Sequence, residues 1–149
     1  MRYPALSDLS LSREAERSLQ IANRHSEIPR MSHWLEEVLS EMDVPVAVRF
    51  KFDLSANEAV TNIIDYAFDD ERSHSISLRL TRTGAELCLE ITDDGRAFDP
   101  LEFEVEPVPM TLEDASPGGL GVKLIRHYMD RCDYRREDGV NHLILMYGL

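Results

Sequence analysis

Cysteine is nearly absent from this chain. Cys88 and Cys132 are the only two among 149 residues, and neither lies in a cluster of metal-ligand residues. Isolated cysteines of this kind exclude a zinc finger and a disulfide framework. We expect both thiols to be small core residues in a protein from a reducing compartment.

Positive charge is also scarce. Sixteen Lys and Arg residues oppose 28 Asp and Glu residues, which gives a formal net charge of -12. Because proteins that bind duplex nucleic acid neutralise phosphates with clustered Lys and Arg, we expect no nucleic-acid partner. The sequence lacks both the ~18 consecutive apolar residues of a membrane-spanning helix and an amino-terminal signal pattern. These absences favour a cytoplasmic protein that does not enter a membrane.

The rest of the composition is typical of a globular protein, with 43% hydrophobic and 30% charged residues. The length favours one domain over residues 1–149. Residues 1–14 are mixed and polar, so we expect a loose lead-in there. Residues 96–117 are rich in proline and acidic residues, and a loop of this length inside a compact domain is typical of a lid.

Hydrophobic periodicity predicts three helices and five strands. Hairpin turns are expected at residues 83–84 and 138–139. Because most strand contacts are then hairpins, we predict an α/β (α+β) two-layer sandwich whose mixed, mainly antiparallel sheet carries three helices on one face. The predicted helices span about 28–42, 45–68 and 118–131, and the predicted strands span 15–23, 76–80, 87–91, 134–137 and 140–147.

Two helix boundaries carry more specific expectations. Ser26 is the expected cap of the first helix. Val46, Val48 and Phe50 alternate with other residues, so the start of the second helix is open between helix and strand. Arg131 is expected near the end of the third helix, where a cation suits the helix dipole.

Two groups of polar residues interrupt the apolar pattern. Glu58 and Asn62 are four residues apart on the second predicted helix and share one face, where a carboxylate beside an amide can accept a proton and coordinate a hard cation. Asp93 and Gly95 end an apolar strand, where a carboxylate can accept a hydrogen bond from an exocyclic amine and glycine permits close backbone approach. Taken alone, each group is more often a solvated helix face or a plain turn.

A glycine-rich stretch opens the third predicted helix. The free backbone amides and the positive dipole end of a helix can hold phosphate oxygens. The spacing matches neither a P-loop nor a dinucleotide fingerprint, and a hinge in an ordinary loop is the alternative. The stretch consists of Gly118, Gly119, Leu120, Gly121 and Val122, followed by the cation Lys123.

Together and in this order, these groups resemble the GHKL superfamily of ATPases, and most closely its stand-alone bacterial serine/threonine kinases that double as anti-sigma factors. Residues 54–68, LSANEAVTNIIDYAF, resemble the family's N-box, and residues 91–100, ITDDGRAFDP, resemble its adenine-binding box. Residues 118–130, GGLGVKLIRHYMD, resemble its phosphate-binding box. The likeness covers about residues 15–147 and implies a Bergerat-type fold that binds ATP and Mg²⁺.

The resemblance also implies a role for each matched residue. Glu58 is implied as the catalytic general base, Asn62 as the Mg²⁺ ligand, Asp93 as the acceptor for the adenine amino group and Gly95 as the residue that lets the chain pass the base. The helix start, Gly118–Lys123, is implied to hold the phosphates. The implied activity is phosphorylation of an anti-anti-sigma (STAS-type) protein, and the implied second partner is a sigma factor. The resemblance implies that the chain regulates transcription by switching between these partners. Whether it forms a homodimer is left open.

Three positions depart from the family's pattern. Tyr66 stands where the family often has histidine, Ala97 replaces the second glycine of Asp-x-Gly-x-Gly, and Val140 replaces the threonine of the closing Gly-Thr. ATP binding is therefore a firmer expectation than catalytic rate, and a non-catalytic, ATP-dependent protein-binding switch is the alternative. The ATP domain of a histidine kinase is disfavoured, because no long two-helix hairpin with a phosphoacceptor histidine precedes the domain.

Overall fold

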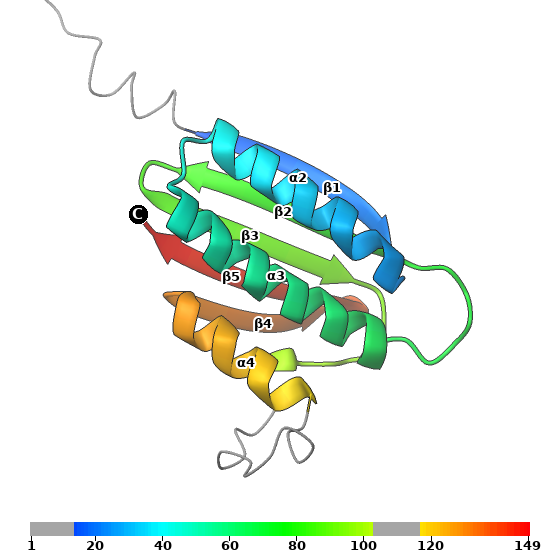
Figure 1. Cartoon of the computed structure of the whole chain (residues 1–149). Helices are drawn as coiled ribbons and strands as arrows, with labels where there is room; N and C mark the ends of the chain where they lie inside the picture. The colour runs from blue at the N-terminus through cyan, green and yellow to red at the C-terminus, as the bar shows by residue number, and fades with distance from the viewer. Residues whose placement is uncertain (1–13, 103–116) are drawn as a thin grey trace, which may run out of the picture.

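The computed structural model describes residues 14–102 and 117–149, which form a five-stranded sheet with helices on one face (Figure 1). The helices are α2 (Ile28–Glu41), α3 (Val46–Tyr66) and α4 (Pro117–Tyr128), with two short 3-10 turns, η1 (His25–Glu27) and η2 (Pro100–Glu102). The strands are β1 (Ala15–Ala22), β2 (Ser75–Thr83), β3 (Glu86–Asp93), β4 (Arg131–Glu137) and β5 (Val140–Gly148). The predicted two-layer sandwich and its element order are confirmed.

The sheet has the strand order β1-β2-β3-β5-β4, and each of these pairings is antiparallel. Both predicted hairpin turns are present. Gly84 has φ +62°, and Asp138 and Gly139 have φ +52° and +78°, the left-handed conformations that tight hairpins need. Because β5 lies between β3 and β4, the last hairpin of the chain runs beside the end of β3.

The core lies between the sheet and the three helices. Helix α3 crosses the middle of the sheet, with α2 and α4 on either side of it (Figure 1). Its predicted apolar stripe is buried, including Phe52, Ala59 and Val60. Full burial of a side chain such as Phe52 contributes about 1.5–3 kcal/mol. The opposite face of the sheet is not covered by any described helix.

Two local predictions, for Ser26 and Arg131, were wrong, and the start of the second helix, which the sequence left open between helix and strand, is helical. Ser26 lies in η1, and the residue at the helix cap is Glu27, which makes no capping hydrogen bond to α2. The alternation at residues 46–50 belongs to the first turn of α3, which leaves Val46 68% and Phe50 58% exposed. Arg131 begins β4, because α4 ends at Tyr128 with Arg126 in its last turn.

The two cysteines also differ from their prediction. Both are free thiols with intermediate exposure, so neither is a fully buried core residue. Cys88 alternates with the buried residues Leu87 and Leu89 of β3, which places it on the uncovered face of the sheet. Burial raises the pKa of each thiol, which keeps both protonated and unreactive at neutral pH.

Parts of two predicted segments lie outside the described residues. These are residues 1–13 of the expected lead-in and residues 103–116 of the expected lid. Of the lid, residues 96–102 are described and end in η2. A search of the described helices found none long and apolar enough to cross a bilayer.

Candidate functional site

The first part of the candidate site is one face of α3. Glu58 is half-buried there, and burial raises its pKa. Among the described residues its carboxylate has neither a hydrogen bond nor an ion pair. A carboxylate that has a raised pKa and no hydrogen-bond or ion-pair partner among its described neighbours is suited to accept a proton from a substrate.

Asn62 lies one turn further along the same face. It is 3% exposed, and its Nδ2 has no hydrogen-bond partner in the described part of the chain. An unpaired buried amide costs about 1–3 kcal/mol, so the arrangement calls for a partner from outside this set of residues. By contrast, Asn57 on the same helix donates to Ser32 Oγ at 2.8 Å and to the Asp53 carbonyl at 2.7 Å.

The surroundings of Asn62 limit what kind of metal site is feasible. Among the described side chains, no group of three or more His, Cys, Asp or Glu residues is placed to hold a metal ion. Mg²⁺ is often bound by only one or two protein oxygens, with water and substrate phosphates as the other ligands. The Oδ1 of Asn62 can supply one such oxygen to a magnesium ion that arrives with a nucleotide, whereas its unpaired Nδ2 is a donor and suits an acceptor such as a phosphate oxygen. The described residues do not form an all-protein metal cage.

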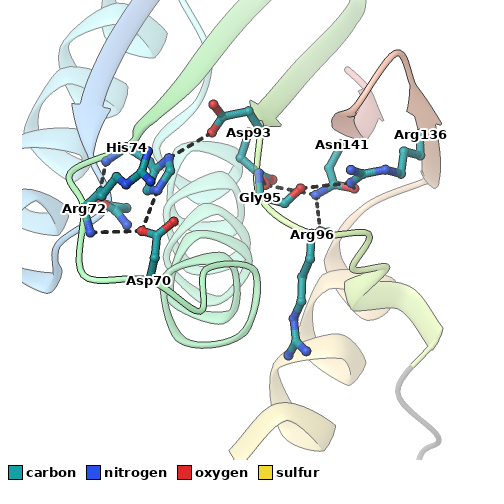
Figure 2. A network of polar contacts seen from close by, with 10 residues as sticks. Asp70, Arg72, His74, Asp93, Gly95, Arg96, Arg136 and Asn141 are labelled. Atoms are coloured by element: carbon teal, nitrogen blue, oxygen red, sulfur yellow. Dashed lines mark hydrogen bonds and ion pairs between the residues drawn. The ribbon is translucent and has the colours of Figure 1, made fainter.

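The second part of the candidate site is the end of β3. The Asp93 carboxylate is 4% exposed, and its Oδ1 accepts hydrogen bonds from Gly95 N and from Asn141 Nδ2, each at 2.9 Å (Figure 2). Burial raises the pKa of Asp93, and these two hydrogen bonds act against that rise. The Oδ2 atom accepts no hydrogen bond from the described residues, so it is available to an amine from a ligand.

Gly95 brings the end of β3 into close contact with the carboxyl end of α3. A Cβ at this position would lie 2.4 Å from the carbonyl oxygen of Ala67 and 2.9 Å from its Cβ, so only glycine fits. The next residue, Arg96, donates from its backbone N to the Ala67 carbonyl at 2.8 Å and from Nε to the Tyr66 carbonyl at 2.7 Å. Asp93 therefore lies at the carboxyl end of α3. Glu58 lies about 12 Å back along the helix axis from Tyr66, a span suited to an extended nucleotide.

The third part is the start of α4. The helix begins at Pro117, one residue before its predicted start, so its first turns contain Gly118 to Lys123. The backbone N–H groups of residues 118–120 have no acceptor within the helix. Figure 1 shows α4 antiparallel to α3, with its first turn beside the carboxyl half of α3. Arg126 Nη2 donates to the Leu101 carbonyl at 2.9 Å, which holds α4 to η2.

The Phe-Asp-Pro sequence after the turn has a structural role. Asp99 Oδ1 accepts a hydrogen bond from Leu101 N at 2.8 Å and so caps η2. The ring of Phe98 lies 5.8 Å from that of Tyr66, and Pro100 is buried. Tyr66, one of the three departures, thus contributes an aromatic contact at the end of α3.

Sequence reasoning missed the contribution of the β4–β5 hairpin. Asn141 is the buried partner of Asp93 in the β3–β5 register, and Arg136 Nη1 donates to the Gly95 carbonyl at 3.0 Å. The signal was present, because Asn141 is a polar residue at an inward position of a strand that otherwise buries Leu143 and Leu145. Val140 alternates with Asn141 and therefore points to the other face of the sheet.

A second missed group lies on the other side of the same turn. His74, in the loop before β2, has Nε2 2.8 Å from Asp70 Oδ1 and Nδ1 3.4 Å from Asp94 Oδ1 (Figure 2). Its ring stacks on Phe68 with centroids 4.7 Å apart. The hydrogen bond with Asp70 is the largest cause that raises the pKa of His74. The turn at residues 93–96 is thus held from two sides.

Comparison with known proteins agrees with this arrangement. The family model of the histidine kinase-like ATPase domain matches residues 21–147. This chain belongs to that family. It is 40% identical over 113 residues to the serine/threonine-protein kinase BtrW of Bordetella bronchiseptica, a match that spans 76% of this chain and 80% of the relative.

Two further relatives have lower sequence identity with this chain. The serine-protein kinase RsbW of Halalkalibacterium halodurans is 31% identical over 91 residues, which span 58% of this chain and 55% of RsbW. An anti-sigma F factor of Clostridium acetobutylicum is 24% identical over 107 residues, 72% of this chain and 74% of the relative. A crystal structure of the RsbU and RsbW domains of a Mycobacterium tuberculosis protein matches with a TM-score of 0.64 at 10% identity, over 91% of this chain and 32% of that chain, which supports the fold.

Proposed function

We propose that this chain is a cytoplasmic, ATP-dependent serine/threonine protein kinase of the anti-sigma-factor type. The observation that carries the proposal is the buried Asp93 carboxylate, whose Oδ2 is left without a protein donor beside a close-fitting glycine turn. The 40% identity with a protein named a serine/threonine-protein kinase supports the kinase assignment. Two free thiols of raised pKa accord with a reducing compartment.

In this proposal the nucleotide lies along the carboxyl half of α3. Asp93 Oδ2 accepts a hydrogen bond from the exocyclic amine of adenine, and Gly95 lets the backbone approach the base. The backbone amides at the start of α4, from Gly118 to Lys123, hold the phosphates. Asn62 holds Mg²⁺, which when bound supplies positive charge to the phosphate oxygens.

Glu58 is the proposed general base. Its carboxylate takes the proton of a serine or threonine hydroxyl on the acceptor protein while the hydroxyl oxygen bonds to the γ-phosphorus. The bond from that phosphorus to the β–γ bridging oxygen breaks, and ADP leaves. A base in this position typically contributes about 10²–10⁴-fold to the rate, and positioning provides much of the remaining acceleration.

The proposed acceptor is an anti-anti-sigma protein of the STAS type, and the proposed second partner is a sigma factor. This chain has a net charge of -12, so a new phosphate on the acceptor would add like charge at the interface and weaken its binding. Release of the modified acceptor would then leave this chain able to hold the sigma factor. A homodimer is also proposed, through β1, which is an edge strand of the described sheet.

The test is phosphate transfer from γ-labelled ATP to a purified STAS-type protein encoded beside this chain. We expect label on a serine or threonine of that protein when the native chain and Mg²⁺ are present. Glu58→Gln should bind ATP and transfer no label, and Glu37→Gln, on exposed α2 surface, should behave like the native chain. ATP binding without any label transfer by the native chain would overturn the kinase assignment and favour a non-catalytic, nucleotide-dependent switch.

A further inference from the structure

We propose that Asn141 is a positioning residue that determines which oxygen of Asp93 faces the nucleobase, and that it thereby sets the selectivity for adenine over bases with a carbonyl at the same position. This inference rests on the proposed ATP-binding function. It concerns a residue of the β4–β5 hairpin, far in sequence from the three groups that the family likeness identifies.

The Asn141 side chain uses all its hydrogen-bonding capacity. Its Nδ2 donates to Asp93 Oδ1 at 2.9 Å and to the Arg96 carbonyl at 2.8 Å (Figure 2). Its Oδ1 accepts from Tyr134 Oη at 2.5 Å and from Arg136 Nη1 at 2.9 Å. An amide offers two donors and two acceptor lone pairs, so every group is matched. A flipped amide would point its N–H donors at the Arg136 cation, and the network therefore allows one orientation.

This orientation of the Asn141 amide determines which hydrogen-bonding groups face each oxygen of Asp93. Oδ1 receives N–H donors from Asn141 and Gly95, and the described residues give Oδ2 none. Because an amide N–H cannot become an acceptor, Asn141 presents a donor to Asp93 at every pH. The bond favours the ionised carboxylate and opposes the effect of burial on the Asp93 pKa. In the ionised carboxylate, the free Oδ2 is purely an acceptor.

An acceptor at this place discriminates between purines. The adenine ring presents an exocyclic amine, which can donate to Oδ2. Hypoxanthine and guanine present a carbonyl oxygen at the equivalent position, which would set two acceptors against each other in a buried site. A ligand that leaves buried polar groups of the site unpaired binds much more weakly, and this cost is how a site discriminates strongly between similar ligands. If Asp93 were free to take up a proton, its Oδ2–H could donate to that carbonyl, and the selectivity would fall.

The β4–β5 hairpin also holds the turn at residues 93–96, through hydrogen bonds from Arg136. Arg136 Nη1 bonds both Asn141 Oδ1 and the Gly95 carbonyl, at 2.9 and 3.0 Å. Tyr134 supplies the other bond to Asn141 without touching Asp93. Removing the Tyr134 hydroxyl should therefore loosen the Asn141 side chain without removing any hydrogen bond of Asp93. This change tests the positioning role of Asn141 separately from its direct contact with Asp93.

The experiment measures the affinities of the full chain for Mg·ATP and Mg·ITP by calorimetry between pH 5.5 and 8.5. The native chain should prefer ATP by at least about tenfold. Asn141→Ala should reduce that preference to about threefold or less, and the loss of ATP affinity on acidification should begin at higher pH, because the Asp93 pKa is no longer held down. Asn141→Asp should relax the preference further, since two adjoining carboxylates share a proton. Thr92→Val, on the other face of β3, is the matched control and should leave both affinities and the pH profile unchanged.

An unchanged ATP-to-ITP ratio and an unchanged pH profile in folded Asn141→Ala, even with both affinities lowered together, would overturn the inference. Should Asn141→Ala not fold, Tyr134→Phe decides the matter, with a two- to threefold fall in the ratio expected and no change as the contrary result. If the native chain binds neither nucleotide at millimolar concentration, the proposed function itself fails. Binding of ATP with a ratio that ignores Asn141 removes only this inference.

Discussion

The two ends of the candidate nucleotide site differ in how their polar groups are satisfied. At the end of β3, Asp93 Oδ1 and all the polar atoms of the Asn141 side chain have protein partners, and Asp93 Oδ2 is the one atom of these two side chains without a partner in the described residues. On α3, Asn62 Nδ2 is buried without a partner in the described residues, and the Glu58 carboxylate has no hydrogen bond or ion pair with them. In the proposed site, the base-binding end is thus largely formed before the ligand arrives, and the catalytic end is completed by the ligand.

This difference has a physical reason. Recognition of a base requires a donor and acceptor pattern held in place, because binding that has to order the site first loses affinity. The catalytic end must instead have unused hydrogen-bonding capacity, since its partners are the nucleotide phosphates, the metal ion and the substrate hydroxyl. Substitutions at each end of the site test this contrast.

Glu58→Gln should have the largest effect, at the catalytic end. Phosphate transfer should fall by about 10²–10⁴-fold, with ATP affinity retained. Burial raises the Glu58 pKa, so the ionised form is disfavoured in the folded chain and stability falls as pH rises through that pKa. The variant should therefore match or exceed the native melting temperature at pH 8. Transfer at the native rate in a time course with labelled ATP would contradict the role of Glu58.

Gly95→Ala should damage the base-binding end. The added Cβ would be 2.4 Å from the Ala67 carbonyl, so the turn must shift, and we expect about 1–3 kcal/mol of destabilisation together with a loss of ATP affinity. Gly84→Ala is the control, because Gly84 has φ +62° and a Cβ added there would have no neighbouring atom within 4 Å. That variant should lose some stability through backbone strain and keep its ATP affinity. Urea unfolding and calorimetry on both variants measure this, and equal ATP affinities in the two would count against the close fit.

Asn62→Ala and Asn57→Ala should behave in opposite ways on the same helix. Among the described residues Asn62 Nδ2 has no partner, so the loss of this side chain should change stability little. The loss of its Oδ1 as a metal ligand should weaken Mg²⁺-dependent ATP binding by about tenfold, or 1.4 kcal/mol. Asn57 is hydrogen-bonded to Ser32 and Asp53, so its removal should destabilise the chain by about 1 kcal/mol without altering ATP affinity. The reverse pattern would show that neither the nucleotide nor its metal ion binds the Asn62 side chain.

His74→Gln should have the smallest effect, limited to pH dependence. Contact with Asp70, and less strongly with Asp94, raises the His74 pKa, so its contribution to stability is complete below the ordinary value of about 6.5. That contribution disappears as pH rises through the raised pKa. Melting temperatures from pH 5.5 to 8.5 should therefore converge for the native and variant chains at high pH. A constant difference across this range would mean that His74 acts by packing on Phe68 alone.

Local patterns were sufficient to predict most of the fold. Alternation identified β2 and β3, Asp138-Gly139 identified the last turn, and helical spacing placed Glu58 and Asn62 on one face of α3. These features depend on neighbours within about one helical turn or one hairpin. The first turn of α3 was ambiguous, because tertiary packing and the position after Pro45 decide between helix and strand there.

The connections that hold the site could not be predicted in the same way. Asn141 is 48 residues from Asp93, and Arg136 is 41 residues from Gly95. Such contacts follow from the strand order, in which β5 adjoins β3. The sequence indicates that Gly95 has a special role, but only the structure shows that the Ala67 carbonyl is the reason.

The most direct test of the account is a calorimetric titration of the native chain with ATP and with GTP, each with and without Mg²⁺. We expect one site per chain, a clear preference for ATP, and weaker binding when the metal is absent. Equal affinity for the two nucleotides would contradict the role of Asp93. A folded chain that shows no heat with millimolar Mg·ATP would contradict the nucleotide site altogether.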